Sequence, residues 1–328
     1  MSAAERPPAQ PADLLRPGRP IVGMSAVLLP CRREGGFDWV AAEAHVARTR
    51  DAGLTPAVNM DTGYVQLLTG EEQRTVLDLA QRTTEGAFVA GAFVADRPGD
   101  PFDLAGYVRA ATEIATRGGT PVIFPSWGLN ELDDDGWVGA LTEIGAELDR
   151  WIGFELGEMF VPYGRIPSLD AYEGLLGIES CIGAKHSSLS RQLEWDRLAL
   201  RDERRPGFHV FTGNDLAIDM VMWGSDYLLG LSTFDPEAFA LRDRWWAEGD
   251  ARFHELNDLL QYLGHFTFRA PVPGYRHDAA IAFDLRRWAN GDGTPPGAPR
   301  RPDADREVLA DILDRLDAVV GREPRGGR

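Results

Sequence analysis

Residues 180–213 contain one complete unit of the pattern that decides the fold: SCIGAK (180–185), SRQLEWDRLAL (190–200) and GFHVFTG (207–213). The outer two runs are short and mostly apolar, and the middle run has the pattern of a helix. Continuous apolar strands that alternate with helices indicate a parallel sheet covered on its outside by the helices. This region therefore predicts two parallel strands joined by a helix.

The same pattern recurs along most of the chain. Eight apolar runs are predicted as strands, at residues 21–29, 55–60, 87–95, 120–126, 151–156, 180–185, 207–213 and 226–232. Helical stretches separate them, and Thr69 followed by Glu72 has the capping-box spacing that begins a helix. Eight such units in 328 residues predict a (β/α)8 TIM barrel with additional C-terminal helices.

The chain is predicted to have three segments. Residues 1–19 are rich in proline and lack a periodic apolar pattern, so we expect a disordered leader there. Residues 20–235 are expected to form the barrel core. Residues 236–328 are expected to supply the eighth barrel helix and a C-terminal helical extension.

The composition argues against several classes of partner and cofactor. The chain has 34 Lys and Arg against 51 Asp and Glu, a formal net charge of −17, which disfavours nucleic acid and anionic membrane surfaces. Two cysteines make no disulfide framework, and six histidines without HxH or HExxH spacing predict no metal site. A nucleotide cofactor has no G-x-G-x-x-G motif to support it. Since no apolar run is long enough for a signal peptide or a membrane span, we expect a cytoplasmic protein.

Lys185 is the strongest candidate for a reacting group. Reacting groups of such barrels lie at the C-terminal ends of the strands, and Lys185 closes the sixth predicted strand. Burial penalises the ammonium form and lowers the pKa of a lysine, which makes its amine a nucleophile suited to Schiff-base formation. The alternative is that the ammonium group reaches solvent or pairs with a carboxylate at the mouth of the barrel.

Four segments in order resemble the dihydrodipicolinate synthase and N-acetylneuraminate lyase family of class I aldolases. They are MDTGYVQLLTGEEQ (60–73), GIESCIGAKHSS (177–188), FTGNDLAIDMVMWGSDYLLGLSTFDP (211–236) and GTPPGAPRRPDADREVLADILDRL (293–316). The resemblance extends from about residue 21 to about residue 320. It implies a cofactor-independent enzyme that is a homo-oligomer, a tetramer or a dimer.

The resemblance also implies roles for the matched residues. Lys185 would form an imine with pyruvate or a related 2-keto acid. The substrate carboxylate would be bound by Thr62, Gly63 and the backbone around Asp61, since hydroxyl and amide donors suit an anion. Two further residues would line the pocket, Gly213 and Leu229. For these small and apolar positions, a tight turn or ordinary packing is an equal alternative.

The sequence departs from the family where synthases have a relay of three hydroxyl groups. Asp61 stands at the position of the first threonine, Trp127 at that of a tyrosine after strand four, and Glu155 at that of a tyrosine on strand five. The spacing to Lys185 leaves Tyr163 or Glu158 as alternatives to Glu155. Arg165 is a possible match to the arginine that binds the second carboxylate in synthases, and it too is expected to bind substrate.

These departures change the chemistry that we expect. If Asp61 and Glu155 both face the Schiff base, one carboxyl group would stay protonated as the acid while the other acts as the base. Alternatively, both bind substrate hydroxyls or pair with Arg165 or Lys185. Carboxylate acceptors suit a polyhydroxylated partner, so we expect a sugar-derived 2-keto acid that is cleaved by a retro-aldol reaction or dehydrated. His186, which follows Lys185 in the strand, is expected to face the helices.

Two other functions are weighed against this Schiff-base lyase. The first is 4-hydroxy-tetrahydrodipicolinate synthase, which joins pyruvate to aspartate semialdehyde in lysine biosynthesis; the missing hydroxyls count against it. The second is a catalytically silent barrel that binds a keto acid or sugar acid, because a fold and even a nucleophile do not prove a reaction.

Overall fold

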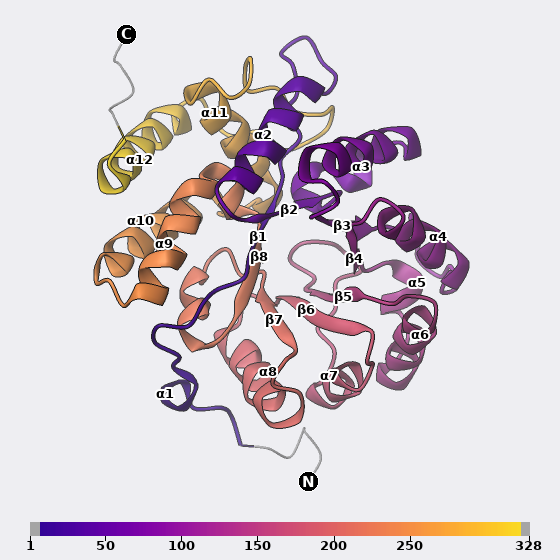
Figure 1. Cartoon of the computed structure of the whole chain (residues 1–328). Helices are drawn as coiled ribbons and strands as arrows, with labels where there is room; N and C mark the ends of the chain where they lie inside the picture. Colours follow the sequence, from indigo (N-terminus) through magenta and orange to yellow (C-terminus); the bar gives the residue numbers. More distant parts are fainter. Residues whose placement is uncertain (1–6, 323–328) are drawn as a thin grey trace.

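The computed structural model describes residues 7–322, and within this range eight parallel strands form a closed barrel. Each strand pairs with the next in chain order, and β8 closes the barrel against β1 (Figure 1). The strands are β1 (Gly23–Ala26), β2 (Thr55–Val58), β3 (Val89–Ala92), β4 (Thr120–Ile123), β5 (Trp151–Leu156), β6 (Cys181–Ser187), β7 (His209–Thr212) and β8 (Asp226–Leu229). Seven lie within a run predicted from the sequence, and β6 continues two residues past its predicted run, so the (β/α)8 TIM barrel is confirmed.

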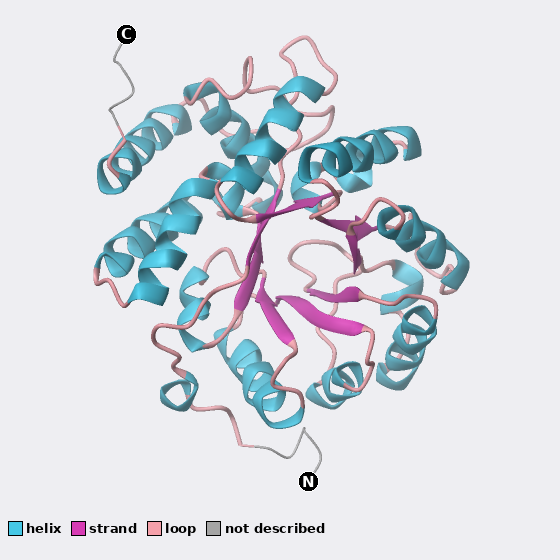
Figure 2. Ribbon diagram, viewed as in Figure 1, coloured by secondary structure: helices cyan, strands magenta, loops and turns pink. Residues whose placement is uncertain are grey.

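Helices surround the barrel on its outside (Figure 2). The main ones are α2 (Trp39–Asp51), α3 (Gly70–Thr84), α4 (Leu104–Ala115), α6 (Asp134–Ala146), α7 (Leu169–Leu176), α8 (Arg191–Arg204) and α9 (Pro236–Glu248). Shorter helices are α1 (Pro11–Leu14), α5 (Trp127–Asn130), η2 (Asp61–Gly63), η3 (Val65–Leu67), η4 (Ile218–Trp223), η5 (Leu231–Phe234) and η6 (Val272–Gly274). The capping box that begins α3 is present as predicted. Among the described residues, no helix combines the length and the apolar character that a membrane span requires.

The additional C-terminal helices are also confirmed: α10 (Arg252–Thr267), α11 (Tyr275–Leu285) and α12 (Asp305–Val320). Helix α10 packs against α9 and α12, and α11 packs against α12 and against η5. Because η5 directly follows β8, this packing brings the first residues of α11 to the C-terminal end of the barrel. The extension therefore reaches the part of the barrel where reacting groups are expected.

The prediction of a disordered leader at residues 1–19 is wrong for the part that the structure describes. Pro11 begins α1, where its missing N–H costs nothing, and Leu14 is buried against Leu198 of α8. The amide of Ala9 donates to Asp196 Oδ1 at 2.8 Å. Residues 1–6 lie outside the described range. Proline content suggested disorder, but one buried leucine and a helix-starting proline favour local order.

Alternation along β5 and β6 decides which side chains enter the barrel. Phe154 pairs with Lys185, and Glu155 pairs with His186. Phe154 belongs to the apolar core inside the barrel, and Lys185 Nζ lies 4.3 Å from the centre of its ring. Successive strand residues point to opposite faces, so Glu155 and His186 face the helices. The prediction that His186 faces outward is confirmed by its bond to Glu155 on that side.

Candidate active site

Lys185 lies in a narrow recess at the C-terminal end of the barrel. The recess is lined by residues from η2, the ends of β5 to β8 and the start of α11; they are Asp61, Thr62, Leu156, Phe160, Lys185, Ser187, Gly213, Asp215, Gly230, Phe268 and Tyr275. Its free volume is about 10 Å³, roughly the space of one water molecule. Only a small part of any ligand can therefore enter the recess beside Lys185.

Lys185 is held close against β7 because residue 213 is glycine. A Cβ atom at Gly213 would lie 2.0 Å from Ser187 Oγ and 2.7 Å from Lys185 Cε, far inside contact distance. Ser187 is two residues after Lys185 on β6 and lines the same recess, as strand alternation requires. The predicted place of Gly213 beside Lys185 is thus present in the structure, and a side chain there would displace the lysine.

Burial lowers the pKa of Lys185 below its ordinary value, while Asp61 and Asp215 oppose the shift because their charges favour the ammonium form. The side chain is 5% exposed, so the alternative in which its ammonium group reaches solvent does not apply. The alternative in which the ammonium group pairs with a carboxylate applies in part, because Asp61 and Asp215 both favour the charged form of the lysine. A desolvated amine with a lowered pKa is the form that reacts with carbonyl groups.

Asp215 is a carboxyl group that the sequence analysis did not select. Burial raises its pKa to about 7, and the neighbouring charge of Asp61 adds to the increase, whereas the amide of Leu231 and Lys185 act against it. That amide donates to Asp215 Oδ1 at 2.7 Å. Near neutral pH, this carboxyl group exists in both protonation states and can give or take a proton. Asp215 lies just after β7, and reacting groups are expected at the C-terminal ends of barrel strands. The sequence therefore contained enough information to predict it.

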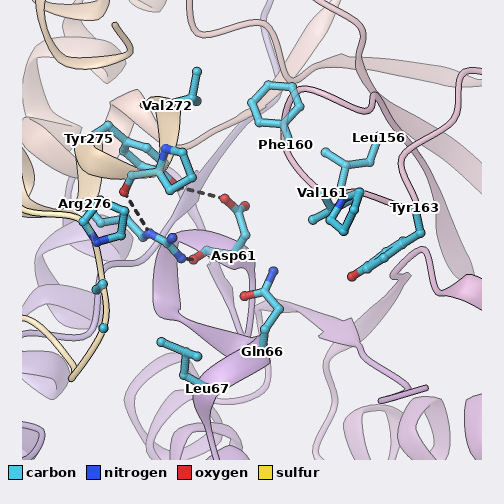
Figure 3. A pocket seen from close by; sticks show the side chains of 15 residues that line it. Asp61, Gln66, Leu67, Leu156, Phe160, Val161, Tyr163, Val272, Tyr275 and Arg276 are labelled. Carbon is cyan, nitrogen blue, oxygen red and sulfur yellow. Dashed lines mark hydrogen bonds between the residues drawn. The ribbon is translucent and has the colours of Figure 1, made fainter. Parts of the chain in front are cut away.

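Tyr275 connects the C-terminal extension to the barrel. Its hydroxyl lies 2.8 Å from Thr62 Oγ1 and donates to Asp61 Oδ2 at 3.1 Å (Figure 3). Phe268 stacks on the tyrosine ring, with centres 4.2 Å apart and planes 16° apart. Burial and the charge of Asp61 raise the pKa of Tyr275 well above its ordinary value, so the phenol stays neutral. Thr62, Tyr275 and Asp61 thus form a chain of proton-carrying groups. The chain begins at the recess.

An outer chamber of about 310 Å³ opens onto this recess. The two spaces share Asp61, Leu156, Phe160 and Tyr275 in their linings. Figure 3 shows Tyr275 and Arg276 on one side of the chamber and Phe160, Val161 and Tyr163 on the other, with Asp61 between them. Tyr163 was an alternative considered for the site, and it lines this outer space. Together, recess and chamber have the size and concave shape of a small-molecule site.

Arg276 lies at the wall of the outer chamber. Its Nη1 atom donates to the carbonyl of Asp61 at 2.9 Å, and its Nε atom donates to the carbonyl of Pro273 at 3.2 Å. The guanidinium group also lies 4.8 Å from the centre of the Tyr64 ring. These contacts place a cation from α11 beside η2. Tyr275 and Arg276 lie in the C-terminal extension and not at the end of a strand. The sequence pattern therefore did not indicate them as site residues.

The predicted role of Glu155 at the Schiff base is wrong. Its side chain points out of the barrel and bonds Arg197 Nη2 of α8 at 2.5 Å and His186 Nδ1 at 2.8 Å. Burial alone would raise the pKa of Glu155, but Arg197 and His186 outweigh it and lower the pKa to about 2. Phe154 instead occupies the inward position on β5. The error is one residue of register, which moves a strand side chain to the opposite face. Glu158, the other alternative, is exposed.

Four other predicted positions need correction. The amide of Gly63 donates to the carbonyl of Met60 at 3.0 Å, which removes it as a donor to a carboxylate. Leu229 lies in the apolar layer between the barrel and the helices, and Gly230 lines the recess instead. Trp127 packs against Tyr163, with ring centres 5.3 Å apart, so Tyr163 stands between it and the chamber.

Arg165 is the fourth of these positions. Its guanidinium group pairs with Asp134 of α6 and donates to the carbonyl of Leu132. The side chain is therefore committed to the layer of helices and does not serve as a binding group for a substrate carboxylate. Its backbone amide, which donates to Leu156 at 2.6 Å, fixes the loop after β5.

Comparison with known proteins gives the fold a name. No protein-family model matches the sequence, and no curated protein is significantly similar to it. Solved structures do match. A dihydrodipicolinate synthase from Rhodopseudomonas palustris has a TM-score of 0.75 at 16% identity, over 92% of this chain and 99% of that one. The chain therefore has the dihydrodipicolinate synthase fold.

Two further neighbours have the same fold. YagE, a prophage protein of the dihydrodipicolinic acid synthase family from E. coli K12, was solved in complex with pyruvate; it has a TM-score of 0.74 at 14% identity, over 90% of this chain and 98% of that one. A catalytic lysine mutant of the sialic acid aldolase from Ruminococcus gnavus has a TM-score of 0.72 at 14% identity, over 92% of this chain and 97% of that one.

We expect Glu155→Gln to destabilise the fold, because it leaves Arg197 buried without its counter-charge. The loss at pH 7 should be about 3–5 kcal/mol in urea unfolding. The lowered pKa of Glu155 sets the pH dependence: wild type keeps its full advantage above the ordinary pKa of 4.5 and loses it as pH falls toward 2. Exposed Glu143→Gln is the control and should change stability by about 0.5 kcal/mol or less. Equal stability of wild type and Glu155→Gln at pH 7 would contradict the assignment.

Proposed function

We propose that the protein is a Schiff-base-forming lyase that acts on a 2-keto acid through an imine on Lys185. The observation that carries the proposal is the buried lysine near the end of β6, whose pKa is lowered and which lines the recess next to the outer chamber. The fold neighbours support it, since they include lyases and a protein solved with pyruvate. Aldol cleavage and dehydration both begin at the same imine.

The chemistry follows from an amine in a dry site. The neutral amine of Lys185 attacks the keto carbon, water leaves, and a protonated imine forms that draws electrons from the neighbouring bonds. In aldol cleavage, a base takes the proton of the hydroxyl group on the second carbon beyond the imine carbon; the bond between that carbon and its neighbour nearer the imine breaks, an aldehyde leaves, and an enamine remains on the lysine. Protonation of the enamine and addition of water release the keto product and restore the amine. Each turnover thus needs groups that move protons.

Three groups at the recess are suited to that task. Tyr275 bridges Thr62 and Asp61, so a proton can pass between the recess and the Asp61 carboxyl group. Asp215, with a pKa of about 7, is neutral in part of the population at neutral pH. Its neutral form lessens the repulsion between the acidic recess and the carboxylate of a keto acid. This division of roles replaces the pairing of Asp61 with Glu155 that the sequence suggested.

The alternative synthase activity has less support. The arginine expected to bind a second carboxylate, Arg165, is paired with Asp134 in the helical layer. A silent binding barrel remains distinguishable by experiment, because it would bind keto acids without turnover or proton exchange. The homo-oligomeric state and the cytoplasmic location stay predictions from the sequence.

Borohydride trapping tests the imine directly. With pyruvate and sodium borohydride, we expect a stable adduct on Lys185, detected by intact mass and peptide mapping, because the reduced imine cannot hydrolyse. Lys185→Arg should give no adduct, since a guanidinium group stays protonated. An adduct only at a site other than Lys185, or none with wild type, would overturn the proposal. Lys185 is the only lysine in the sequence, so the mapping has only to separate it from the N-terminal amine.

Gly213→Ala should slow this trapping by about ten-fold or more, because the new methyl group collides with Lys185 Cε and Ser187 Oγ and costs about 1–3 kcal/mol. The matched control is Gly139→Ala in α6, where a Cβ meets no atom within 4 Å. That control should trap pyruvate at the wild-type rate. Equal trapping by the two variants would show that the close packing of Gly213 against the lysine is unimportant.

Tyr275→Phe tests the proton chain. The change keeps the ring that stacks on Phe268 and removes only the hydroxyl that bridges Thr62 and Asp61. Exchange of the methyl hydrogens of pyruvate for deuterium, followed by NMR, should slow by about 10²-fold or more, and by much more than borohydride trapping slows. Tyr262→Phe on the exposed face of α10 is the control. Unchanged exchange in Tyr275→Phe would remove the hydroxyl from the mechanism.

A further inference from the structure

The recess and the outer chamber divide any bound substrate into two parts. The recess has room for little beyond the reacting carbons at Lys185, since its free volume is about 10 Å³. The chamber of about 310 Å³ is where the rest of the molecule must extend. Phe160 and Leu156 line both spaces, so they stand at the junction. The composition of the chamber walls therefore selects the distal part of the substrate.

Those walls are mostly apolar. Nine of the lining residues are aliphatic, phenylalanine or proline, and they come from η3, from the end of β5 and the loop after it, and from two C-terminal segments: Leu67, Leu156, Phe160, Val161, Pro162, Val272, Pro273, Ala298 and Pro299. Figure 3 shows Phe160 and Val161 facing Val272 and Tyr275 across the open space. Apolar walls on two sides of a cavity favour an apolar group between them, at about 25 cal/mol for each Å² removed from water.

The polar groups of the chamber are few and several are already engaged. The Tyr275 hydroxyl bonds Thr62 and Asp61. Arg276 donates to two backbone carbonyls. Asp61, which accepts the Tyr275 hydroxyl, Gln66 and Tyr163 complete the polar lining. A polyhydroxylated chain would lose several hydrogen bonds to water here, and each one left unmade costs about 1–3 kcal/mol.

We infer that the substrate is a 2-keto acid with an apolar or aromatic group beyond the reacting carbons, and that this group occupies the outer chamber. The inference rests on the proposed imine chemistry at Lys185 and specifies its substrate class. It replaces the sugar-derived keto acid favoured by the sequence. That expectation depended on Glu155 as a second carboxylate acceptor in the cavity, and Glu155 faces α8 instead. The second carboxyl group of the site, Asp215, lines the recess and is not among the chamber residues.

Trapping with a panel of three keto acids tests the inference. The probes are pyruvate, 4-phenyl-2-oxobutanoate and 2-keto-3-deoxygluconate, each titrated against wild type with borohydride and read by intact mass. We expect the aryl compound to reach half-maximal labelling at about ten-fold lower concentration than pyruvate, equivalent to about 1.4 kcal/mol. The sugar acid should gain no advantage over pyruvate.

A pair of matched variants locates the effect. Val161→Ser makes one chamber wall polar, and Val40→Ser makes the same change at a residue of α2 that is 78% exposed. The preference for the aryl probe over pyruvate should fall by about five-fold in Val161→Ser, near 1 kcal/mol, and persist in Val40→Ser. A preference that survives Val161→Ser would overturn the chamber as the binding place of the apolar group.

The outcomes separate the two proposals. If pyruvate labels Lys185 and the aryl compound has no advantage, or if the sugar acid labels best, the substrate class is wrong while the imine chemistry stands. If none of the three compounds labels Lys185, the proposed function fails, and the substrate class fails with it.

Discussion

The desolvation of the Lys185 ammonium group is the constraint on which the rest of the site depends. Inside the barrel the lysine lies over the ring of Phe154, and its pKa falls because burial penalises the charge. Asp61 and Asp215 limit that fall, and the absence of a side chain at Gly213 gives the lysine its place. One buried charge thus explains why carboxyl groups and a glycine surround it.

The same low-dielectric setting acts on the neighbours of the lysine. Burial raises the pKa of Asp215 to about 7 and keeps Tyr275 neutral, so both groups can hold a proton where an exposed carboxylate could not. Outside the barrel the result is the opposite. Glu155 is as deeply buried, yet Arg197 and His186 hold its pKa at about 2. The effect of burial on a carboxyl group therefore depends on its partners. In the recess it raises the pKa of Asp215, whereas in the helical layer the ion pairs of Glu155 outweigh it.

Much of the fold could be predicted because its signal is local. Each strand is a short apolar run between helical stretches, and a lysine at the end of such a run is conspicuous. The prediction for Glu155 was wrong because the face that a residue occupies depends on strand register. An apolar run that is buried on both faces does not reveal this register. The prediction that Leu229 lines the pocket was wrong for the same reason.

Other site residues lay beyond this kind of reasoning. Tyr275 and Arg276 reach the site through the packing of α11 against η5, a contact between distant parts of the chain. Arg165 forms an ion pair with Asp134, and no spacing of residues in the sequence indicates this pair. Only Asp215, two residues past Gly213, lay within reach of the rule that selected Lys185.

The barrel holds Lys185, and the C-terminal extension supplies much of the wall of the outer chamber. This arrangement affects how such proteins can diverge. Lys185 lies on β6 and Gly213 directly follows β7, where the close packing tolerates little change. Much of the outer chamber comes from residues 272–276 and 297–299, which belong to the extension. Apart from Tyr275, residues in these short segments can change and reshape the chamber while Lys185 keeps its position. Substitutions at the other positions of the C-terminal region can therefore change which ligands fit the chamber without moving Lys185.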